Sequence, residues 1–573
     1  MPQADLLYVS DQIVHVLRAA GCKHLPLVPG ASFRGLHDSV VNQQEEGGPE
    51  VITCTSEMVA VAVAHAYAKA TRGVAYAVVH DLVGLMQASM SVYNAWVDRA
   101  PVVVLGGGGP ADPAKRRPVD WYHSANVQSG LIRDFVKWSD DPVTAQGTID
   151  SIVRAHRTAL TEPQGPVYVT LDSALQEEPA AEVEFPASDV FAAPPPSGAR
   201  QADVDAVARR LLDARLPVIV AGRVGLHPTA TPLLTSLAQR LGAALRDERN
   251  LNAVPSDHPL NLTGDRQLLK DADVILCVEA ADLNLLHNQA GLGSSEYELI
   301  DLSQNELTLQ SWANTGQTRA LSTRWLPAQG RYGLEQISAA VDAALIRESR
   351  ERSGMRRRRR AELGDRRAKL LETLAAERAD SWDASPVSTP RLVSELYQVV
   401  KGEPWLLTLR NTRSWPEQVW GFERGGQYLG HSGGGGVGYG PGALIGGALA
   451  ARDRGELAVG VIGDGDLMYS PGVLWTASHH QIPMLAVVHN NRTYYNDEEH
   501  QRAVAQARGR PLDRAHIGVR LDEPGVDFAA LAESHGAVGI GPVTEPGQLR
   551  AALSDGLRAA KAGGTVLVDV HTG

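Results

Sequence analysis

The chain has few cysteines and no long apolar run, and both absences narrow the class of protein. Its 573 residues include three cysteines, Cys22, Cys54 and Cys277, which lie far apart among apolar residues. This usage suggests neither disulfides nor a zinc site, and it favours a reducing, cytoplasmic setting. The longest apolar stretches have the length of strands, so we expect no transmembrane helix.

The chain also lacks an excess of positive charge. Its formal net charge is −12, which argues against general nucleic-acid binding. Residues 356–360 are consecutive arginines, but a single charge run is typical of the solvated face of a linker helix. The first 21 residues have the pattern of an amphipathic helix and not that of a signal peptide.

What the chain does contain is a repeated alternation of strand and helix patterns. Hydrophobic residues make up 43% of the sequence, enough for large cores. The alternation predicts an α/β fold with three doubly wound parallel-sheet domains. We expect these at residues 1–180, 198–346 and 386–573, with a Pro- and Ala-rich linker before the second and a helical linker at 347–385 before the third.

The most informative motif is Gly463-Asp464-Gly465, which is followed 24 residues later by Asn490-Asn491. Each part comes directly after a strand-like apolar run, at 457–462 and 484–489. The motif therefore places a carboxylate and a carboxamide together at the carboxyl edge of a parallel sheet, where α/β folds bind ligands. Such oxygens suit Mg²⁺ with open positions for phosphate, so the motif indicates a magnesium-diphosphate site.

A glutamate far upstream is informative in combination with this motif. Glu57 follows the strand-like residues 50–55 and opens a helix of small residues, where the helix dipole alone would favour it. The combination with the Gly463–Asn491 motif in a later domain resembles thiamine diphosphate (ThDP) enzymes of the acetolactate synthase, benzoylformate decarboxylase and pyruvate decarboxylase branch. The resemblance covers nearly the whole chain and implies pyrimidine-binding, central and diphosphate-binding domains in that order.

The resemblance implies a set of cofactor and metal contacts. Asp464 and Asn491 match the side-chain ligands of Mg²⁺, and the carbonyl of Thr493 matches the backbone ligand. The residues matched to cofactor contacts are Glu57, Asn411, Thr412, Gly435, Val437, Gly463, Gly465, Leu467, Tyr469 and Asn491. Asp466 is left out, because a carboxylate beside a diphosphate is unfavourable unless it points away or caps a helix. The Gly-rich residues 433–440 are alternatively a flexible turn.

The resemblance also gives Glu57 a role and the chain a partner. A buried Glu57 has a raised pKa and shares a proton with the ring nitrogen N1′ of the cofactor. In the family the glutamate and the diphosphate site come from different subunits. A homodimer is then the minimum active unit, and a homotetramer is expected.

Histidines are the candidate residues for determining which reaction the enzyme catalyses. His80 ends a strand-like run and resembles a catalytic histidine of benzoylformate decarboxylase, with a structural role as the alternative. His123 falls near the paired histidines of pyruvate decarboxylase and is alternatively a surface-loop residue. His287 loosely matches a second histidine of benzoylformate decarboxylase or lies at a domain interface. His479 and His480 are interpreted as structural.

Two further segments bear on the substrate. Residues 493–501 match one wall of the family's substrate pocket, and 498–520 are long and charged enough for a mobile lid. Ala31 stands where decarboxylases carry an acidic residue or serine, with Ser32 adjacent. The short Gly222–Gly225 pair is too weak to assign the FAD or ADP that some relatives bind in the central domain.

The sequence therefore predicts a ThDP- and Mg²⁺-dependent C–C lyase or carboligase that acts on 2-oxo acids or 2-hydroxy ketones and resembles benzoylformate decarboxylase. An acetolactate synthase-like carboligase, a diketone hydrolase and an acyl-CoA lyase are the enzymatic alternatives. A non-catalytic scaffold is disfavoured by the intact Glu57, Asp464 and Asn491. The substrate itself lies beyond the sequence.

Overall fold

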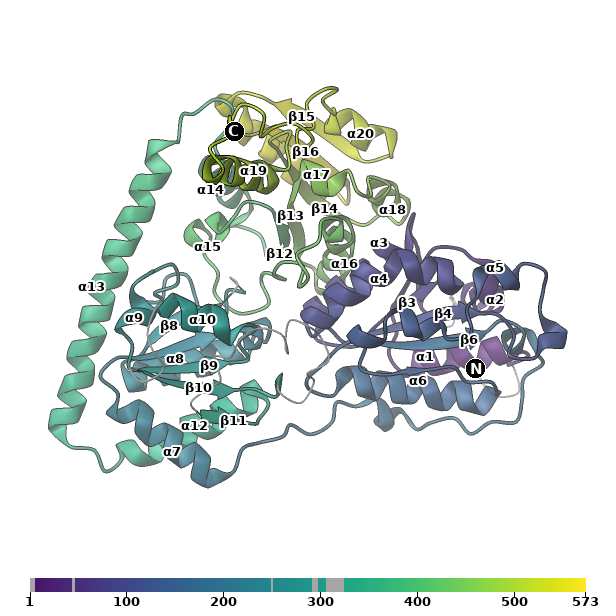
Figure 1. Ribbon diagram of the computed structural model, residues 1–573, viewed down its shortest axis with the longest axis horizontal. Coiled ribbons are helices and arrows are strands. Elements are labelled where there is room, and N and C mark those ends of the chain that lie inside the picture. The colour runs from purple at the N-terminus through teal and green to yellow at the C-terminus, as the bar shows by residue number, and fades with distance from the viewer. Residues whose placement is uncertain (1–5, 44–46, 249–250, 291–296, 306–323) are drawn as a thin grey trace.

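The computed structural model describes residues 6–43, 47–248, 251–290, 297–305 and 324–573. These residues form three β-sheets, each covered by helices and each in its own part of the molecule (Figure 1). Every ladder that joins two named strands is parallel. The predicted α/β class with three parallel-sheet domains is confirmed.

The first sheet has the strand order β2-β1-β3-β4-β6-β5. Its strands are β1 (His24–Leu27), β2 (Glu50–Thr53), β3 (Ala75–Val79), β4 (Val102–Gly108), β5 (Ser139–Asp140) and β6 (Val167–Asp172). Its helices are α1 (Val9–Ala19), α2 (Arg34–Asn42), α3 (Glu57–Thr71), α4 (Asp81–Val97), α5 (Asp120–His123) and α6 (Ala145–Leu160). All seven residues of β4 are buried, as expected for a parallel strand that is covered on both faces.

The second sheet has the order β11-β10-β9-β7-β8. Its strands are β7 (Pro217–Ala221), β8 (Ala244–Asp247), β9 (Val274–Val278), β10 (Glu298–Leu302) and β11 (Arg324–Leu326). Its helices include α7 (Gln201–Asp213), α8 (Ala230–Leu241), α9 (Leu268–Asp271), α10 (Leu283–Ala290) and α12 (Gly330–Leu345). Buried aliphatic side chains from these strands and helices form one continuous core.

The third sheet has the order β12-β13-β14-β16-β15. Its strands are β12 (Trp405–Arg410), β13 (Leu457–Gly463), β14 (Met484–Asn490), β15 (Val538–Val543) and β16 (Thr565–His571). The helices are α14 (Thr389–Val400), α15 (Trp415–Val419), α16 (Tyr439–Arg454), α17 (Asp464–Leu467), α18 (Val473–His479), α19 (Tyr495–Ala507), α20 (Phe528–Ser534) and α21 (Leu549–Lys561). The chain's C-terminus lies beside this sheet (Figure 1).

Helices α3 and α16 join the first and third blocks of the chain. Glycines on α16 let the two backbones approach closely: a Cβ at Gly442 would lie 2.4 Å from Cβ of Ala62, and one at Gly446 would lie 2.2 Å from the carbonyl oxygen of Val63. Small residues on α3 complete the contact, and both helices contribute to one core. The small-residue composition of α3 is therefore a consequence of close helix packing.

Helix α13 (Arg350–Asp380) links the second and third blocks and runs along the left edge of Figure 1. Its arginines bind backbone carbonyls of the second block. Arg359 donates to the carbonyl oxygens of Ala214 at 2.6 Å and Gly242 at 2.7 Å, which follow the ends of α7 and α8. Positive charge at helix C-termini is stabilising. The arginine run thus belongs to a linker helix, as the sequence predicts.

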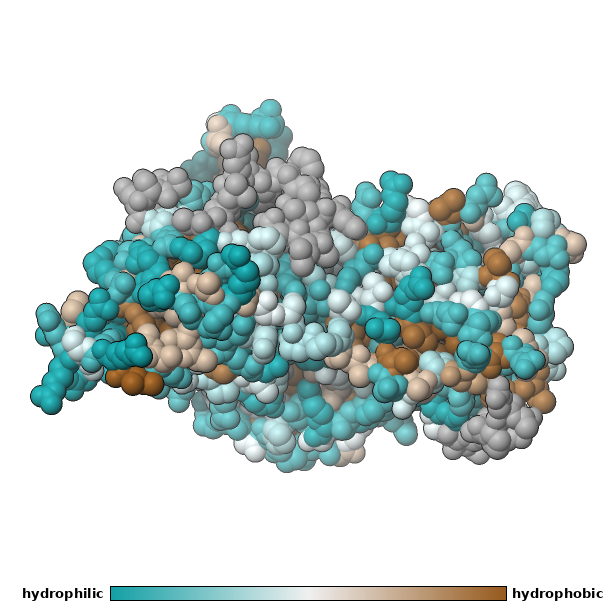
Figure 2. Space-filling model, turned by 90° about the horizontal axis from the view of Figure 1, so that it is seen from below, coloured by the Kyte–Doolittle hydropathy of each residue, from teal (hydrophilic) through white to brown (hydrophobic). Residues whose placement is uncertain are grey.

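The surface is mainly hydrophilic on the face shown in Figure 2, and its hydrophobic groups are most extensive on the right, over the first block. Within the described residues, none of the helices has the length and apolar character needed to cross a membrane.

Candidate active site

Strand register brings the Gly463–Asn491 motif together. In the third sheet β13 pairs with β14 so that Gly463 lies opposite His489. Asp464 and Asn490 follow these two residues, so the side chains after both strands meet at the carboxyl edge of the sheet. The two asparagines differ in their surroundings. Asn490 is buried and donates to Asp569 Oδ1 at 2.9 Å, whereas Asn491 lies beyond the strand end and is half-buried.

Asp464 presents a carboxylate oxygen suited to a cation. Its Oδ1 accepts the backbone N–H of Gly465 at 2.9 Å, while Oδ2 is buried and has no hydrogen-bond partner. Burial raises the pKa of Asp464 to about 6, although backbone N–H groups oppose this. The amide oxygen of Asn491 accepts from the N–H of Thr493 at 3.2 Å, which folds the chain back beside Asp464. A buried carboxylate oxygen without a hydrogen-bond partner fits Mg²⁺ as a ligand, and the amide and carbonyl oxygens of residues 491–493 have the same hard-oxygen chemistry.

Asp466 is held by hydrogen bonds to the residues beside this corner. Its Oδ1 accepts from the N–H of Gly438 at 2.5 Å. Burial raises the pKa of Asp466, and the N–H groups of Gly438 and Gly440 oppose this. The carboxylate therefore caps the first turn of α16, where negative charge is stabilised. This agrees with its exclusion from the predicted cofactor contacts. The helix capped by Asp466 is the one that packs on α3.

The Gly-rich residues 433–438 lie along α4 of the first block. The N–H of Gly434 donates to Asn94 Oδ1 at 3.1 Å, and a Cβ there would lie 2.6 Å from that oxygen. Gly435 has a φ of +68° and Gly438 one of +104°, so glycine is required at both turns. Between them, the side chain of Val437 is exposed. The stretch therefore has a defined backbone conformation and connects the third block with α4 of the first.

The other predicted contact residues surround the motif. Asn411 and Thr412 follow β12, and Asn411 lies against Gly463. Leu467 is buried within α17, whereas Tyr469 is 55% exposed. Arg413, in the same loop but not among the predicted contacts, has a φ of +52° and lies over the ring of Tyr495. A single exposed arginine gives no sequence signal of such a position.

Glu57 begins α3 and is 6% exposed. Its side chain points at α4, where a Cβ on Gly84 would lie 2.8 Å from Oε1. Burial raises the pKa of Glu57, as the sequence predicts. Glu57 shares its face of α3 with Val61 and Ala64, which pack in the core with α4. The residues that pack against α16 occupy the opposite face of α3.

Two predicted histidines of the first block lie together. His80 follows β3, and its ring meets that of His123 edge to face at a centroid distance of 5.1 Å. Ser32 is fully buried, and its Oγ lies 2.7 Å from His80 Nδ1. Gly30 packs directly against the His80 ring, and a Cβ there would lie 2.6 Å from the imidazole. Burial and the charges of His123 and Arg117 lower the pKa of His80, which favours the neutral imidazole.

The remaining histidines lie elsewhere. His287 belongs to α10 of the second block and is hydrogen-bonded to the Tyr297 hydroxyl. His480 accepts from the N–H of Thr53 at 2.8 Å and so joins the third block to the first, while His479 stacks on Trp475. These contacts agree with the structural interpretation of the His479–His480 pair.

The predicted lid segment includes most of α19 and is attached to the motif at its far end. The N–H of Tyr494 donates to the Val519 carbonyl at 2.9 Å, and the N–H of Leu521 donates to the Arg492 carbonyl at 2.8 Å. Glu498 is buried and accepts from Arg502 at 2.8 Å. The segment therefore closes a loop that begins and ends beside the predicted metal ligands.

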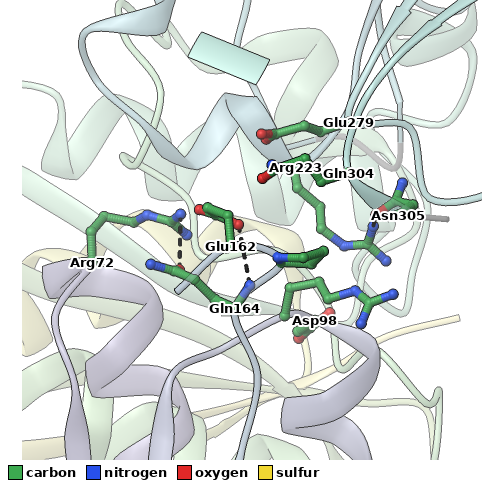
Figure 3. A pocket seen from close by; sticks show the side chains of 10 residues that line it. Arg72, Asp98, Glu162, Gln164, Arg223, Glu279, Gln304 and Asn305 are labelled. Atoms are coloured by element: carbon green, nitrogen blue, oxygen red, sulfur yellow. Dashed lines mark hydrogen bonds between the residues drawn. The ribbon is translucent and has the colours of Figure 1, made fainter. Parts of the chain in front are cut away.

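A separate polar pocket lies between the first and second blocks (Figure 3). It is lined by Arg72, Asp98, Arg99, Glu162, Pro163, Gln164, Arg223, Glu279, Gln304 and Asn305. Arg223 donates across the junction to the Val97 carbonyl at 2.9 Å. Three arginines face three acidic residues around a cavity of about 20 Å³, which is room for roughly one water molecule. The pocket lies at the junction of the two blocks, and none of the predicted site residues lines it.

Comparisons with known proteins agree with this geometry. The family described as "Thiamine pyrophosphate enzyme, N-terminal TPP binding domain" matches residues 7–129, and "Thiamine pyrophosphate enzyme, C-terminal TPP binding domain" matches residues 411–570. These matches contain Glu57, His80 and His123 in the first case and the Gly463–Asn491 motif in the second.

Relatives span almost the whole chain. A benzoylformate decarboxylase of Pseudomonas aeruginosa is 26% identical over 89% of this chain and 90% of its own length. An acetolactate synthase of Bacillus subtilis is 24% identical over 98% of this chain and 92% of its own. The solved structure of a Rhodococcus jostii thiamine diphosphate-dependent 4-hydroxybenzoylformate decarboxylase superposes with a TM-score of 0.75, at 20% identity and 99% coverage of both chains. The chain belongs to the thiamine pyrophosphate-dependent enzymes, and its cofactor is ThDP.

Proposed function

We propose that the chain is a ThDP- and Mg²⁺-dependent C–C lyase or carboligase acting on 2-oxo acids or 2-hydroxy ketones, with decarboxylation of a 2-oxo acid as its leading reaction. The observation that carries this proposal is the contact between His80 and His123 at the carboxyl edge of the first sheet. Paired imidazoles at a ligand-binding edge suit the proton transfers that accompany loss of CO₂. The similarity to a benzoylformate decarboxylase supports the same reaction.

The third block is suited to hold the cofactor's diphosphate through a metal ion. The side chains of Asp464 and Asn491 and the carbonyl of Thr493 would bind Mg²⁺, since all three provide hard oxygen ligands. The cofactor contacts would come from Asn411, Thr412, Gly435, Val437, Gly463, Gly465, Leu467 and Tyr469. When bound, ThDP supplies a carbon nucleophile and a sink for the electron pair released by bond cleavage.

Two sets of side chains then handle protons. Burial raises the pKa of Glu57 and so favours the protonated carboxyl, which would share its proton with a ring nitrogen of the cofactor. His80 has Ser32 at Nδ1, which leaves Nε2 for a substrate oxygen or carbon. His123 lies beside it as the second group able to exchange a proton.

A second copy of the chain completes the site. Glu57 lies on the face of α3 that is turned away from α16, so it does not face the third block of its own chain. Large hydrophobic side chains are exposed on α4, which Glu57 faces, and beyond the Gly463–Asn491 motif's helix α17: Met86 is 54% exposed and Tyr469 is 55% exposed. Burial of such residues against another copy is favourable. We therefore assign a homodimer as the minimum active unit, with a homotetramer as the expected assembly.

The proposal is tested by product analysis on the ThDP- and Mg²⁺-loaded enzyme. Benzoylformate, 4-hydroxybenzoylformate, pyruvate and several acyloins are supplied separately, and CO₂, aldehyde and ligation products are measured. We expect CO₂ and aldehyde from at least one 2-oxo acid. Release of neither from any 2-oxo acid, with acyloin formation or cleavage instead, would replace decarboxylation by carboligation as the leading reaction.

Substitution of His80 tests the assignment of the pair. His80→Ala is expected to slow turnover by roughly 10²–10⁴-fold, the span of general acid–base groups, with unchanged ThDP affinity. His479→Ala is the matched control, because His479 is exposed and stacks on Trp475. Equal turnover in both variants and the wild type would remove His80 from the reaction.

Asp464 provides a separate test of the metal site. Asp464→Ala deletes the carboxylate whose Oδ2 is buried without a partner, so Mg²⁺ binding is expected to be lost and ThDP affinity to fall. Calorimetric titration with ThDP, with and without Mg²⁺, measures both effects. Unchanged affinities would move the metal away from Asp464.

A further inference from the structure

Asp81 is a buried carboxylate that the proposed reaction does not use. It directly follows His80 as the first residue of α4, and it is 1% exposed. Its φ is +49°, a left-handed conformation that non-glycine residues seldom adopt and that persists only where surrounding contacts hold it. Asp81 Oδ1 accepts from the N–H of Leu82 at 2.9 Å. The remaining oxygen is directed toward a different part of the chain.

That oxygen reaches the residue after His123. The Ser124 hydroxyl donates to Asp81 Oδ2 at 2.9 Å, and the same hydroxyl accepts from the N–H of Gly109 at 3.2 Å. Gly109 has no Cβ, and one placed there would lie 2.7 Å from the Ser124 oxygen. A chain of two hydrogen bonds therefore connects the end of β3, the segment after β4 and the end of α5.

Helix α5 needs such an attachment because it has little core of its own. It consists of Asp120–His123, and only Asp120 among these residues is buried. Trp121 is 81% exposed and Tyr122 is 54% exposed. The other side-chain anchor is Arg117, which pairs with Asp120 within the same segment and donates to the Ala31 carbonyl at 3.1 Å. The Ser124–Asp81 bond acts directly beside His123.

We propose that Asp81 is a positioning residue: through Ser124 it holds α5 so that His123 stays in edge-to-face contact with His80. The two bonded residues each follow one of the two histidines, so their hydrogen bond fixes the separation of the imidazoles. The proposal rests on the proposed function in one respect, because His123 must act in the reaction for its position to affect turnover.

Ser124→Ala removes the hydroxyl and leaves both histidines in place. We expect kcat on a 2-oxo acid that the product analysis identifies as a substrate to fall by roughly 10–100-fold. A small misplacement of a reacting group has an effect of this size. Ser124→Thr keeps a hydroxyl and is expected to recover most of the loss. Ser151→Ala is the matched control, because it also deletes a serine–aspartate hydrogen bond of the first block, from the buried Ser151 to Asp140.

A double-mutant cycle shows whether the effect acts through His123. In a His123→Ala background, Ser124→Ala is expected to change kcat by less than about twofold, because the group that it positions is already absent. An equal fall in both backgrounds would mean that Ser124 acts without His123, which overturns the proposal. Unchanged kcat in Ser124→Ala with intact His123 overturns it as well.

Hydrogen exchange separates this proposal from the proposed function. In the enzyme without substrate, amides of residues 120–124 are expected to exchange faster in Ser124→Ala and in Asp81→Ala, and to be unchanged in Ser151→Ala. If His123→Ala turns over normally, His123 has no part in the reaction, and the positioning role falls with it. Unaltered exchange in both Ser124→Ala and Asp81→Ala would refute the positioning role of the Asp81–Ser124 hydrogen bond even if His123 proves essential.

Discussion

Glu57 is defined by its face of α3. The carboxyl is buried against Gly84, and its pKa is raised because burial disfavours the charged form. Glu57→Gln keeps the shape and removes the exchangeable proton. Turnover is expected to fall by roughly 10²–10⁴-fold, while ThDP and Mg²⁺ still bind with nearly native affinity in calorimetry. Full activity of the variant would show that Glu57 takes no part in proton transfer.

The raised pKa of Glu57 also predicts a pH dependence of stability. The folded state holds this proton above the ordinary pKa of 4.5, where the unfolded chain has released it. Glu57 therefore stabilises the folded state less as pH rises from 4.5 through the raised value. Glu57→Gln lacks this effect, so its melting temperature relative to wild type, without cofactor, is expected to increase between pH 4.5 and 8. A difference that stays constant across this range would contradict the buried ionisation.

At the scale of single elements, the contact of α3 with α16 depends on glycine. A Cβ at Gly446 would lie 2.2 Å from the Val63 carbonyl oxygen, and backbone cannot move aside easily. Gly446→Ala is expected to lower the free energy of unfolding by about 1–3 kcal/mol through overpacking. Gly364 in α13 has nothing near its Cβ position, so Gly364→Ala should stabilise by about 0.5–1 kcal/mol through helix propensity. Thermal melts of both variants measure the contrast, and equal shifts would refute the packing argument.

Helix α13 shows that an arginine run can be structural. Arg359 donates to carbonyls at the ends of α7 and α8, whereas its neighbour Arg358 is exposed. Arg359→Ala is expected to lower the free energy of unfolding by about 1–3 kcal/mol, because charged hydrogen bonds to buried carbonyls are lost. Arg358→Ala removes the same charge and should have little effect in denaturant titrations. Similar losses in both would mean that charge alone, and not the carbonyl contacts, is responsible.

Sequence patterns predict elements well here and predict contacts between loops poorly. Apolar runs locate β13 and β14, and parallel pairing then places Asp464 near Asn491. The same runs do not distinguish Asn490 from Asn491, because that depends on the bond from Asn490 to Asp569.

Long-range side-chain bonds explain the rest of what the sequence does not predict. Asp81 and Ser124 are 43 residues apart, and no periodicity indicates that they meet. Ser32 is noted in the sequence as the neighbour of Ala31, yet its bond to His80 depends on the pairing of β1 with β3. The polar pocket of Figure 3 likewise joins residues from separate blocks.

At the scale of the whole molecule, the three blocks are joined by different kinds of contact. The first and third blocks share the core of α3 and α16, while the second block is attached through Arg223 at its junction with the first and through α13. Glu57 and the Gly463–Asn491 motif lie in different blocks, and Glu57 is on the face of α3 that is turned away from α16. If the proposed dimer is the active unit, dilution below its dissociation constant is expected to lower specific activity.

The orientation of Glu57 away from α16 has a consequence for mixtures of defective chains. If each site takes its glutamate from one copy and its metal motif from another, Glu57→Gln and Asp464→Ala chains can repair each other. Random pairing of equal amounts should restore about a quarter of wild-type activity, because half of the dimers are mixed and each has one intact site. Mixing Glu57→Gln chains with chains carrying both substitutions should restore none. Two inactive gene copies would then complement within one cell, as separate genes do.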